Sequence, residues 1–296
     1  MLDAPSFRAA LAGWYHARRR RLPWREEPTP YRVWVSEIML QQTQVATVLP
    51  YFDRFVARFP DVATLAAAPE EDVLGLWAGL GYYRRCRHLH AAAKVMVQQH
   101  DAQVPDTLPE LLALPGIGRY TAGAIASIAY GIVTPLLDGN VSRVLARRAA
   151  LEEAADGTVG TRKLWALADA LVDPEAPSDH NQAMMELGAL VCTPRQPLCT
   201  TCPVSERCAG LAGGDPQGFP IKKPRRKPTP VLGVSGFASD ADGAILLARR
   251  PTDGLLGGLW ELPGGELPAR TARREGLTRL LQERLGLDAD VGGHLA

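Results

Sequence analysis

Four of the five cysteines of this 296-residue chain crowd into one short segment, which constrains the fold more than any other feature. They are Cys192, Cys199, Cys202 and Cys208, spaced C-x6-C-x2-C-x5-C. The N-terminus lacks the basic-then-apolar order of a secretion signal. Thiols this close together, in a chain without such a signal, favour a metal site over disulfides. The segment therefore predicts a compact loop around a metal centre.

The ligand set and its spacing narrow the kind of metal centre. Thiolates are soft ligands that suit zinc or an iron–sulfur cluster. Zinc sites more often pair two C-x2-C knuckles, and this segment has only one. The wide first gap and the purely cysteine ligands favour a [4Fe–4S] cluster, with adventitious zinc or chance clustering as the alternatives. We interpret the remaining cysteine, Cys86, as a small core residue on a helix.

The first 210 residues have the apolar spacing of helices, separated by prolines and glycines. The expected helices are 33–49, 62–79, 86–97, 108–113, 120–130, 141–151, 162–172 and 180–191. Residues 120–137 carry no charge, but they contain glycine and proline and are shorter than the about 20 apolar residues of a spanning helix. We therefore expect a soluble, cytoplasmic protein with no membrane partner.

Composition changes near residue 210. Residues 211–230 are rich in Gly, Pro and basic side chains without a periodic apolar face, so they predict a linker. Its basic residues either lie along phosphate or form a solvated tether. After Pro230 the pattern predicts two strands around Asp240–Gly243, a loop, and a helix over about 270–285.

The segment Leu114–Tyr120 joins two predicted helices through two glycines, Gly116 and Gly118. The glycines permit a tight turn with exposed backbone N–H groups, and the following helix directs its N-terminus at that turn. Such a turn is an anion site that positions nucleic acid through its phosphates without reading sequence. An ordinary connection between two helices is the alternative. The net charge of +1 averages a mildly basic first part with a mildly acidic last part, so it does not argue against nucleic acid.

Several motifs together resemble the helix-hairpin-helix DNA glycosylases. These are the hairpin LPGIGRYTAGAI, the segment LDGNVSRVL about twenty residues later, and the cysteine loop. Within that family, WVSEIMLQQTQV, GLGYYRR and HNQAMMELGALVC are similar to the adenine DNA glycosylase branch. The resemblance covers about residues 7–210. It implies duplex DNA containing A:8-oxoguanine or A:G mispairs as the partner, and adenine as the excised base.

A glycosylase flips its target nucleotide out of the duplex, donates a proton to the leaving base and stabilises an oxocarbenium-like sugar. Glu37 interrupts an apolar run, where desolvation would raise its pKa; spacing alone also permits a solvated face. Asp138 precedes a predicted helix, where an N-cap is the simpler interpretation. The resemblance implies that Glu37 is the general acid and that Asp138 stabilises the sugar cation. It also implies Asn140 as a hydrogen-bonding neighbour of Asp138.

Lysine is scarce before the predicted linker, where Lys94 and Lys163 lie in no motif. Bifunctional relatives of the endonuclease III type carry a lysine just after the hairpin for Schiff-base chemistry. Here that place is taken by Tyr120, which is expected to pack and hydrogen-bond beside Asp138, or else to be a core tyrosine. The chain is therefore expected to be monofunctional. The alternatives are a bifunctional glycosylase/lyase and a non-catalytic protein that binds damaged DNA.

The resemblance also implies residues that contact the substrate. Gln42 and Thr43 would meet the base opposite adenine, and Leu80 and Tyr82 would wedge into the base stack. Residues of the adenine pocket would be Trp24, Arg25, Leu40, Val45 and Gln182. Without the resemblance, Leu40 and Val45 are better explained as core.

The last segment resembles a Nudix box, of which Gly265, Arg279, Glu283, Gly286 and Leu287 match. Thr271, Leu280 and Arg284 replace carboxylates that should bind Mg²⁺, and one surviving acid cannot assemble a hard-cation site. Nucleoside-diphosphate hydrolysis is therefore disfavoured. The segment is similar to the 8-oxoguanine-sensing module of the family, which normally continues further, so we expect the domain to be incomplete.

These inferences predict a mainly α protein with a two-lobed helix-hairpin-helix glycosylase core, a [4Fe–4S] loop and an incomplete α/β Nudix-like domain. Residues 1–28 with 134–210 would form the cluster-bearing lobe, and 29–133 a six-helix barrel lobe. Residues 211–230 would be the linker and 231–296 the partial Nudix-like domain. A monomer acting on DNA in a bacterial-type cytoplasm is expected.

Overall fold

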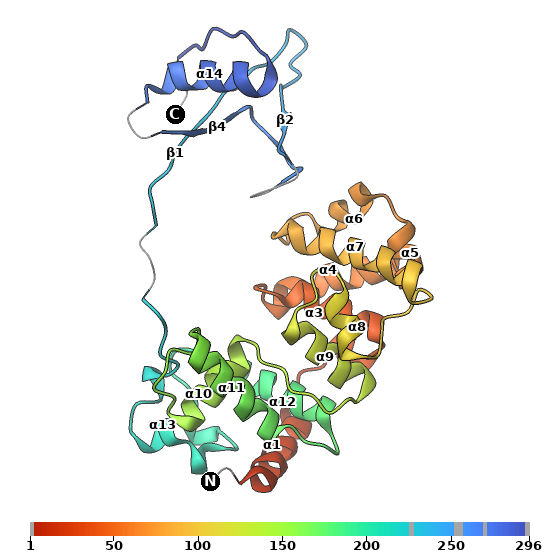
Figure 1. Cartoon of the computed structure of the whole chain (residues 1–296), viewed down its shortest axis with the longest axis vertical. Helices are drawn as coiled ribbons and strands as arrows, with labels where there is room; N and C mark the ends of the chain where they lie inside the picture. The colour runs from red at the N-terminus through yellow and green to blue at the C-terminus, as the bar shows by residue number, and fades with distance from the viewer. Residues whose placement is uncertain (1–2, 225–227, 252–256, 269–270, 294–296) are drawn as a thin grey trace. The chain divides into compact units, whose positions relative to one another are not determined.

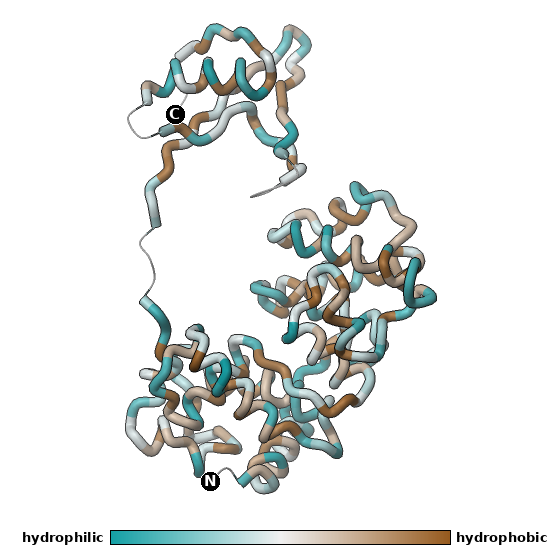
Figure 2. Tube along the Cα trace, viewed as in Figure 1, coloured by the Kyte–Doolittle hydropathy of each residue, from teal (hydrophilic) through white to brown (hydrophobic). Residues whose placement is uncertain are grey.

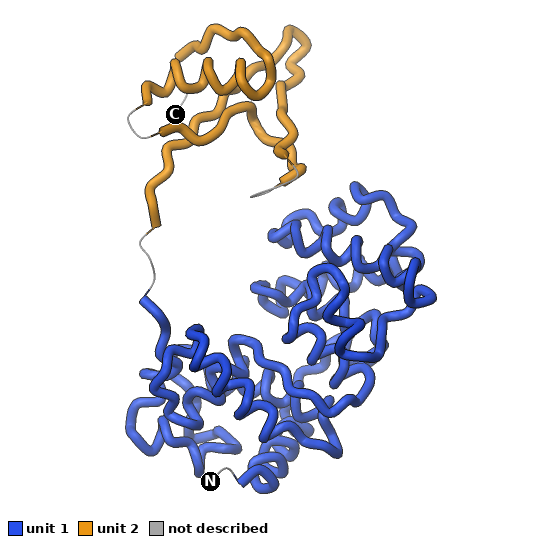
Figure 3. The backbone as a smooth tube through the Cα atoms, in the orientation of Figure 1, with its two compact units in different colours: residues 1–224 blue, residues 225–296 orange. Residues whose placement is uncertain are grey.

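The computed structural model describes residues 3–224, 228–251, 257–268 and 271–293. It divides the chain into two compact units, 1–224 and 225–296 (Figure 3). The helices of the first unit are α1 (Ala4–Arg18), α2 (Pro23–Glu26), α3 (Pro30–Leu40), α4 (Val45–Arg58), α5 (Val62–Ala67), α6 (Glu70–Trp77), α7 (Tyr83–Gln99), α8 (Leu108–Ala113), α9 (Arg119–Tyr130), α10 (Gly139–Ala149), α11 (Thr158–Leu171), α12 (Pro177–Leu190) and α13 (Ala209–Ala212). None of the described helices is long and apolar enough to cross a membrane.

Helix starts in the first unit follow local chemistry. The side chains of Thr29, Asp61 and Asp138 accept hydrogen bonds from the first turns of α3, α5 and α10. Such N-caps satisfy backbone N–H groups that have no partner within the helix. Proline occupies an early position of several helices, Pro30 and Pro177 among them, where its missing N–H costs nothing.

The helices of the first unit enclose two hydrophobic cores. One lies among α2–α9 and buries large side chains such as Trp34, Phe52 and Trp77. The other lies among α1, α10, α11 and α12 and buries Tyr15 and Leu145, for example. Figure 1 shows the two corresponding lobes, and hydrophobic and hydrophilic stretches alternate along their helices in Figure 2. Helix α9 contributes side chains to both cores, so it joins the lobes.

Two details of the predicted lobes differ from the structure. Leu22 and Trp24 were assigned to the cluster-bearing lobe with residues 1–28, but they are buried in the core of the other lobe. Residues 29–133, all described, hold the seven helices α3–α9 rather than six. Pro69 ends α5 and separates it from α6, because the residue before a proline disfavours the helical conformation.

The predicted linker is shorter than 211–230, because residues 211–224 belong to the first unit. The Arg147 guanidinium donates to the carbonyl of Phe219 at 3.1 Å. The backbone N–H of Ala155 donates to the Ile221 carbonyl at 2.8 Å, and that of Lys223 donates to Asp156 at 2.9 Å. The composition of the segment does not predict these contacts. The segment resembles a linker because its apolar residues have no regular spacing.

The second unit contains two short antiparallel strand pairs and a helix. Its elements are β1 (Leu232–Ser235), β2 (Ala248–Arg249), β3 (Trp260–Glu261), β4 (Gly264–Leu267) and α14 (Arg273–Leu285). Strand β1 pairs with β4, Leu232 opposite Leu267, and β2 pairs with β3. The two strands predicted around Asp240–Gly243 are β1 and β2, but each pairs with a later strand, and the described residues between them form an isolated bridge, Ser239 with Ile245. Helix α14 contacts β1 and β4, and Leu277 and Leu281 are buried there.

Candidate active site

A cavity of about 520 Å³ opens where the two lobes of the first unit meet. Residues from α2, α3, the turn before α4, α9, α10 and α12 line it. Ten of the predicted site residues are among them: Trp24, Arg25, Glu37, Leu40, Thr43, Val45, Tyr120, Asp138, Asn140 and Gln182. The fold thus brings into one cavity predicted residues that are up to 158 positions apart in the sequence, as Trp24 and Gln182 are.

Glu37 is buried on α3, and its side chain faces the cavity. The pKa of its carboxyl is raised to about 7, chiefly by desolvation and to a smaller extent by the nearby Asp138 charge. The Tyr120 hydroxyl, from α9, donates a hydrogen bond to Glu37 Oε2 at 2.5 Å and opposes that shift, as does the charge of Arg25. Burial, together with the neighbouring carboxyls, raises the pKa of Tyr120 well above its usual value. Tyr120 therefore stays a neutral donor, while Glu37 can hold a proton near neutral pH.

Asp138 is the N-cap of α10 and also lines the cavity. Its Oδ1 accepts from the backbone N–H of Val141 at 2.7 Å, and its Oδ2 accepts from Asn140 Nδ2 at 2.9 Å. Desolvation raises the pKa of Asp138, whereas these hydrogen bonds and the charge of Arg143 favour its ionised form. The N-cap and functional interpretations of Asp138 are therefore compatible, since Oδ1 caps the helix while the residue also lines the cavity.

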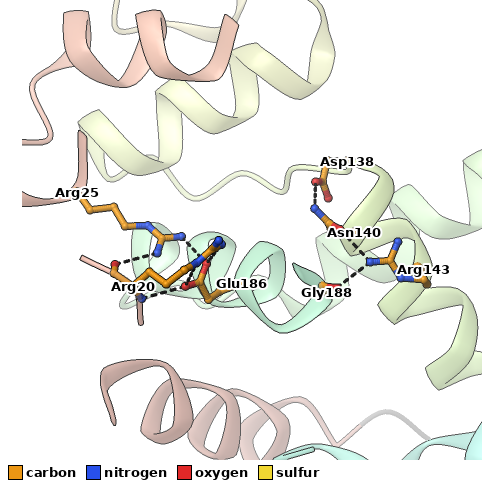
Figure 4. Close-up of polar contacts among 7 residues, drawn as sticks. All are labelled: Arg20, Arg25, Asp138, Asn140, Arg143, Glu186 and Gly188. Carbon is orange, nitrogen blue, oxygen red and sulfur yellow. Dashed lines mark hydrogen bonds and ion pairs between the residues drawn. The ribbon is translucent and has the colours of Figure 1, made fainter. Parts of the chain in front are cut away.

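Arg143 connects Asp138 to the end of α12, as Figure 4 shows. Its guanidinium donates to Asn140 Oδ1 at 2.9 Å and to the carbonyls of Gly188 and Cys192, both at 2.7 Å. A Cβ at Gly188 would lie 2.6 Å from that of Asn140, so only glycine allows α12 to approach α10 this closely. The position of Asn140 beside Asp138 is thus fixed from two sides.

A second network on the cavity wall was missed by sequence reasoning. Glu186, on α12, is fully buried and accepts hydrogen bonds from Arg20 Nε at 2.8 Å and Nη2 at 2.6 Å, and from Arg25 Nη2 at 3.0 Å (Figure 4). Burial alone would raise the pKa of Glu186, but these donors lower it to about 2. Its position four residues after Gln182, on the same helical face, was the only signal in the sequence.

Five predicted contact residues lie outside the cavity lining: Gln42, Leu80, Tyr82, Gly116 and Gly118. Gly116 has a φ of +76°, and a Cβ there would lie 2.6 Å from that of His88, so the hairpin turn between α8 and α9 requires glycine. Gly118 is the N-cap residue of α9. Gln42 and Tyr82 are exposed residues in turns, with φ of 59° and 50°. Leu80, expected to wedge into a base stack, is instead buried in the core.

The four clustered cysteines lie in the loop after α12, and each is partly buried. In the described part of the chain, no three or more His, Cys, Asp or Glu side chains stand close enough to hold a single metal ion. The thiols still influence one another, because the charges of the other three contribute to the raised pKa of Cys202, after burial. Arg147 Nη1 lies 3.3 Å from Cys192 Sγ. The donor set of this loop, four partly buried thiols with no other ligand type, fits an iron–sulfur cluster.

Arg284 occupies a place in the second unit where the Nudix pattern expects a carboxylate. Its guanidinium donates to the carbonyl of Gly264 and lies 3.3 Å from Glu261 Oε1. A cation held against β4 opposes binding of Mg²⁺ there. Like the sequence, the local structure disfavours hydrolysis of nucleoside diphosphates by this unit.

Comparison with known proteins identifies both units. Residues 35–169 match the model of the HhH-GPD superfamily base excision DNA repair proteins, and residues 235–295 match a NUDIX domain. The solved structure of a thermostable thymine-DNA glycosylase shares the fold with a TM-score of 0.66 at 26% identity. That match covers 71% of this chain and 97% of that structure. The mainly helical glycosylase core followed by a Nudix-like unit, as predicted, is confirmed.

Curated adenine DNA glycosylases match over both units. The relative from Homo sapiens is 41% identical in an alignment of 340 positions, which covers 96% of this chain and 62% of the relative. This chain thus spans less than two thirds of that relative's length. The relative from Schizosaccharomyces pombe is 34% identical in an alignment of 321 positions, which covers 88% of this chain and 70% of the relative. With this identity over most of both sequences, the chain belongs to the adenine DNA glycosylase family.

Proposed function

We propose that this chain is a monofunctional adenine DNA glycosylase of base excision repair, which removes adenine mispaired with 8-oxoguanine or guanine in duplex DNA. The observation that carries the proposal is the pair of unequal carboxyls at one cavity. Glu37 is buried with a pKa of about 7, and Asp138 accepts two hydrogen bonds that favour its charge. Two carboxyls in different environments are the groups that hydrolysis of a glycosidic bond requires.

The reaction is a hydrolysis in which Glu37 moves a proton twice. Adenine, flipped into the cavity, receives the Glu37 proton on a ring nitrogen, and the N-glycosidic bond breaks with its electron pair going to the base. The ionised Asp138 stabilises the resulting sugar cation. Glu37, now a carboxylate, accepts a proton from the water that attacks C1′. Adenine and an abasic site are the products, and Glu37 is again protonated.

The lining of the cavity supports base removal without strand cleavage. Schiff-base chemistry at C1′ needs a primary amine near the sugar. No lysine is among the described residues that line the cavity, and Lys94 and Lys163 are exposed elsewhere. Tyr120, at the place of the lysine in bifunctional relatives, instead donates to Glu37.

Two further parts of the proposal rest on the surroundings of the cavity. Gln42 and Thr43 stand in the turn at the cavity edge, where the opposite base of the mispair would be met. Cys192, Cys199, Cys202 and Cys208 would hold a [4Fe–4S] cluster. Such a cluster, when bound, cross-links the loop that follows α12. Because Arg143 donates to the carbonyl of Cys192, that loop also helps to hold α10 in place.

The experiment is adenine release from an A:8-oxoguanine duplex compared with A:T, under single-turnover conditions. We expect release from the mispair, and a loss of about 100-fold or more in Glu37→Gln with duplex binding retained, since general acid catalysis contributes at least that much. Glu71→Gln, an exposed glutamate on α6, is the matched control and should keep full activity. Normal turnover by Glu37→Gln would contradict the assignment. A covalent adduct trapped by borohydride would contradict the monofunctional mechanism.

A further inference from the structure

Arg85, on α7, lies between two turns at the edge of the active-site lobe. One is the turn Gln41–Gln44, which joins α3 to α4 and contributes Thr43 and Gln44 to the cavity lining. The other is the turn 78–82, which joins α6 to α7. The side chain of Arg85 is partly buried and contacts both turns, so it is placed where it can couple the conformation of one turn to that of the other.

Toward the first turn, Arg85 completes the end of α3. Its Nη1 donates to the carbonyls of Ile38 and Met39, each at 2.9 Å, and to that of Gln41. The last carbonyls of a helix have no partner within the helix, and a cation there also complements the helix dipole. Arg85 Nη2 continues to Thr43 Oγ1 at 3.2 Å. The residue after Glu37 and a residue of the cavity lining are therefore held by one guanidinium.

Toward the second turn, Arg85 Nη2 donates to the carbonyl of Gly81 at 3.4 Å. The guanidinium carbon lies 5.2 Å from the ring centre of Tyr82 and 5.5 Å from that of Trp77. Trp77 is fully buried and donates to the same Gly81 carbonyl at 3.0 Å. Arg85 thus joins an exposed tyrosine to a fixed point of the core.

Each turn contains a non-glycine residue in left-handed backbone, Gln42 in the first and Tyr82 in the second. Such a conformation is costly for these residue types and persists where the surroundings hold it. Arg85 contacts Tyr82 directly and bonds to the residues on both sides of Gln42. The planar fork of arginine can reach several acceptors at fixed angles, which an ammonium group cannot do.

We propose that Arg85 is a positioning residue for adenine excision, which holds the turn Gln41–Gln44 and the turn 78–82 in one arrangement beside the cavity. The inference rests on the proposed function, and it adds that discrimination of the opposite base depends on a side chain that does not touch DNA. Arg85 acts through Gln42, Thr43 and Tyr82, and through the end of the helix that carries Glu37.

The test compares Arg85→Lys and Arg85→Gln with wild type by single-turnover release of adenine from A:8-oxoguanine and A:G duplexes. A separate titration with duplex in excess over enzyme gives the correctly folded fraction, from the amplitude of the initial burst of adenine release. We expect the rate constant on A:8-oxoguanine to fall on the order of 10- to 100-fold, since several hydrogen bonds to a charged group are lost. The preference for A:8-oxoguanine over A:G should also narrow. A purely structural role would lower the burst amplitude and leave the rate constant and the preference unchanged.

Arg58→Gln is the matched control, because Arg58 also lies over a ring, that of Phe59 at 5.1 Å, but its ion pair is with Asp72 on α6 rather than with either turn. Hydrogen exchange provides a measurement that does not depend on activity. Exchange at the amides of Thr43 and Leu80, which are hydrogen-bonded within the two turns, should be faster in both Arg85 variants and unchanged in the control. A rate constant for adenine release by Arg85→Lys equal to that of wild type would overturn the positioning role. Unchanged hydrogen exchange at the amides of Thr43 and Leu80 in the two Arg85 variants would overturn it as well. Absence of adenine release by wild type would instead overturn the proposed function.

Discussion

Glu37 and Asp138 differ in what donates to them and in how exposed they are, since Glu37 is buried and Asp138 is partly buried. Desolvation raises the pKa of both carboxyls. Asp138 accepts from a backbone N–H and from Asn140, whereas Glu37 accepts from the hydroxyl of Tyr120. The charge of Asp138 raises the pKa of Glu37 in turn. This arrangement allows one carboxyl to carry a proton while its neighbour is ionised, which is the division of labour that a glycosidase needs.

The pH dependence of adenine release follows from the pKa of Glu37, about 7. The acid form of Glu37 donates the proton, so the single-turnover rate constant should fall as pH rises above about 7. Tyr120→Phe removes a hydrogen bond that lowers this pKa. The alkaline fall should therefore begin at higher pH in the variant than in wild type. Rate constants on an A:8-oxoguanine duplex between pH 6 and 9 measure the alkaline fall in wild type and its shift in Tyr120→Phe.

The two profiles can also contradict this account. An alkaline fall that stays at the same pH in Tyr120→Phe would mean that Tyr120 does not influence the acid. Tyr31→Phe is a suitable control, because Tyr31 donates to the carbonyl of Phe59 in the core and does not line the cavity. Its profile should match that of wild type.

At the scale of elements, Glu186 joins α12 to α2 and to the segment before it through Arg25 and Arg20. Its carboxyl is fully buried, so removing its charge leaves cations without their partner in a desolvated place. Glu186→Gln should lower the free energy of unfolding by about 3 kcal/mol, as is typical when one member of a buried pair is removed. Denaturant titration at pH 7 measures this loss. Glu26→Gln, which removes the partner of exposed Arg21, should change stability little.

The ion pairs of Glu186 also predict how the loss of stability in Glu186→Gln depends on pH. The pKa of Glu186 is about 2 in the folded protein, below its usual value of 4.5. Its stabilising contribution is therefore fully present above pH 4.5 and is lost as pH falls toward 2. The difference in stability between wild type and Glu186→Gln should shrink over that range. A difference that stayed constant down to pH 2 would show that the carboxylate charge is not what holds these elements.

Local signals were sufficient to predict most helices but not how elements pair. The range 108–113 was predicted for α8 from apolar spacing and flanking prolines, and it agrees with Leu108–Ala113. The predicted helix 33–49 is instead divided into α3 and α4 by the turn at Gln42. The backbone of Gln42 is left-handed, and no local residue preference predicts that conformation. The pairing of β1 with β4 depends on contacts across thirty residues, which composition does not encode.

At the scale of the whole molecule, the site is assembled from both lobes of the first unit. The family resemblance named the carboxyls and half of the cavity lining, because those residues stand in recognisable motifs. The contact between Arg20 and Glu186 was not predicted, because 166 positions separate the two residues in the sequence. Their side chains lie 2.6 Å apart in the structure. Arg20 lies in the run Arg18–Arg21, which the sequence alone suggests to be a solvated face, and the packing of α12 against α1 places the run beside Glu186. Long-range ion pairs are thus the part of the site that motifs leave out.

The boundary of the helical unit gives a prediction about the whole chain. Residues 211–224 were expected to be linker, yet Phe219 and Ile221 accept hydrogen bonds from Arg147 and Ala155. Arg147 is buried, so its guanidinium Nε would lose its partner if the segment were removed. A fragment of residues 1–210 should therefore be less stable than 1–224 by about 2–4 kcal/mol, since each lost hydrogen bond costs about 1 kcal/mol and the buried Nε of Arg147, left without an acceptor, costs more.

Denaturant titrations of the two fragments, side by side, measure that difference. Phe219→Ala in the longer fragment is a useful comparison, because it keeps the backbone carbonyl that accepts from Arg147 and removes only the ring beside Gly210. If the carbonyls carry the effect, this variant should retain more of the stability than deletion of the segment does. Equal stability of 1–210 and 1–224 would mean that the segment is a tether after all, and that the contacts of Arg147 with it contribute nothing to the fold.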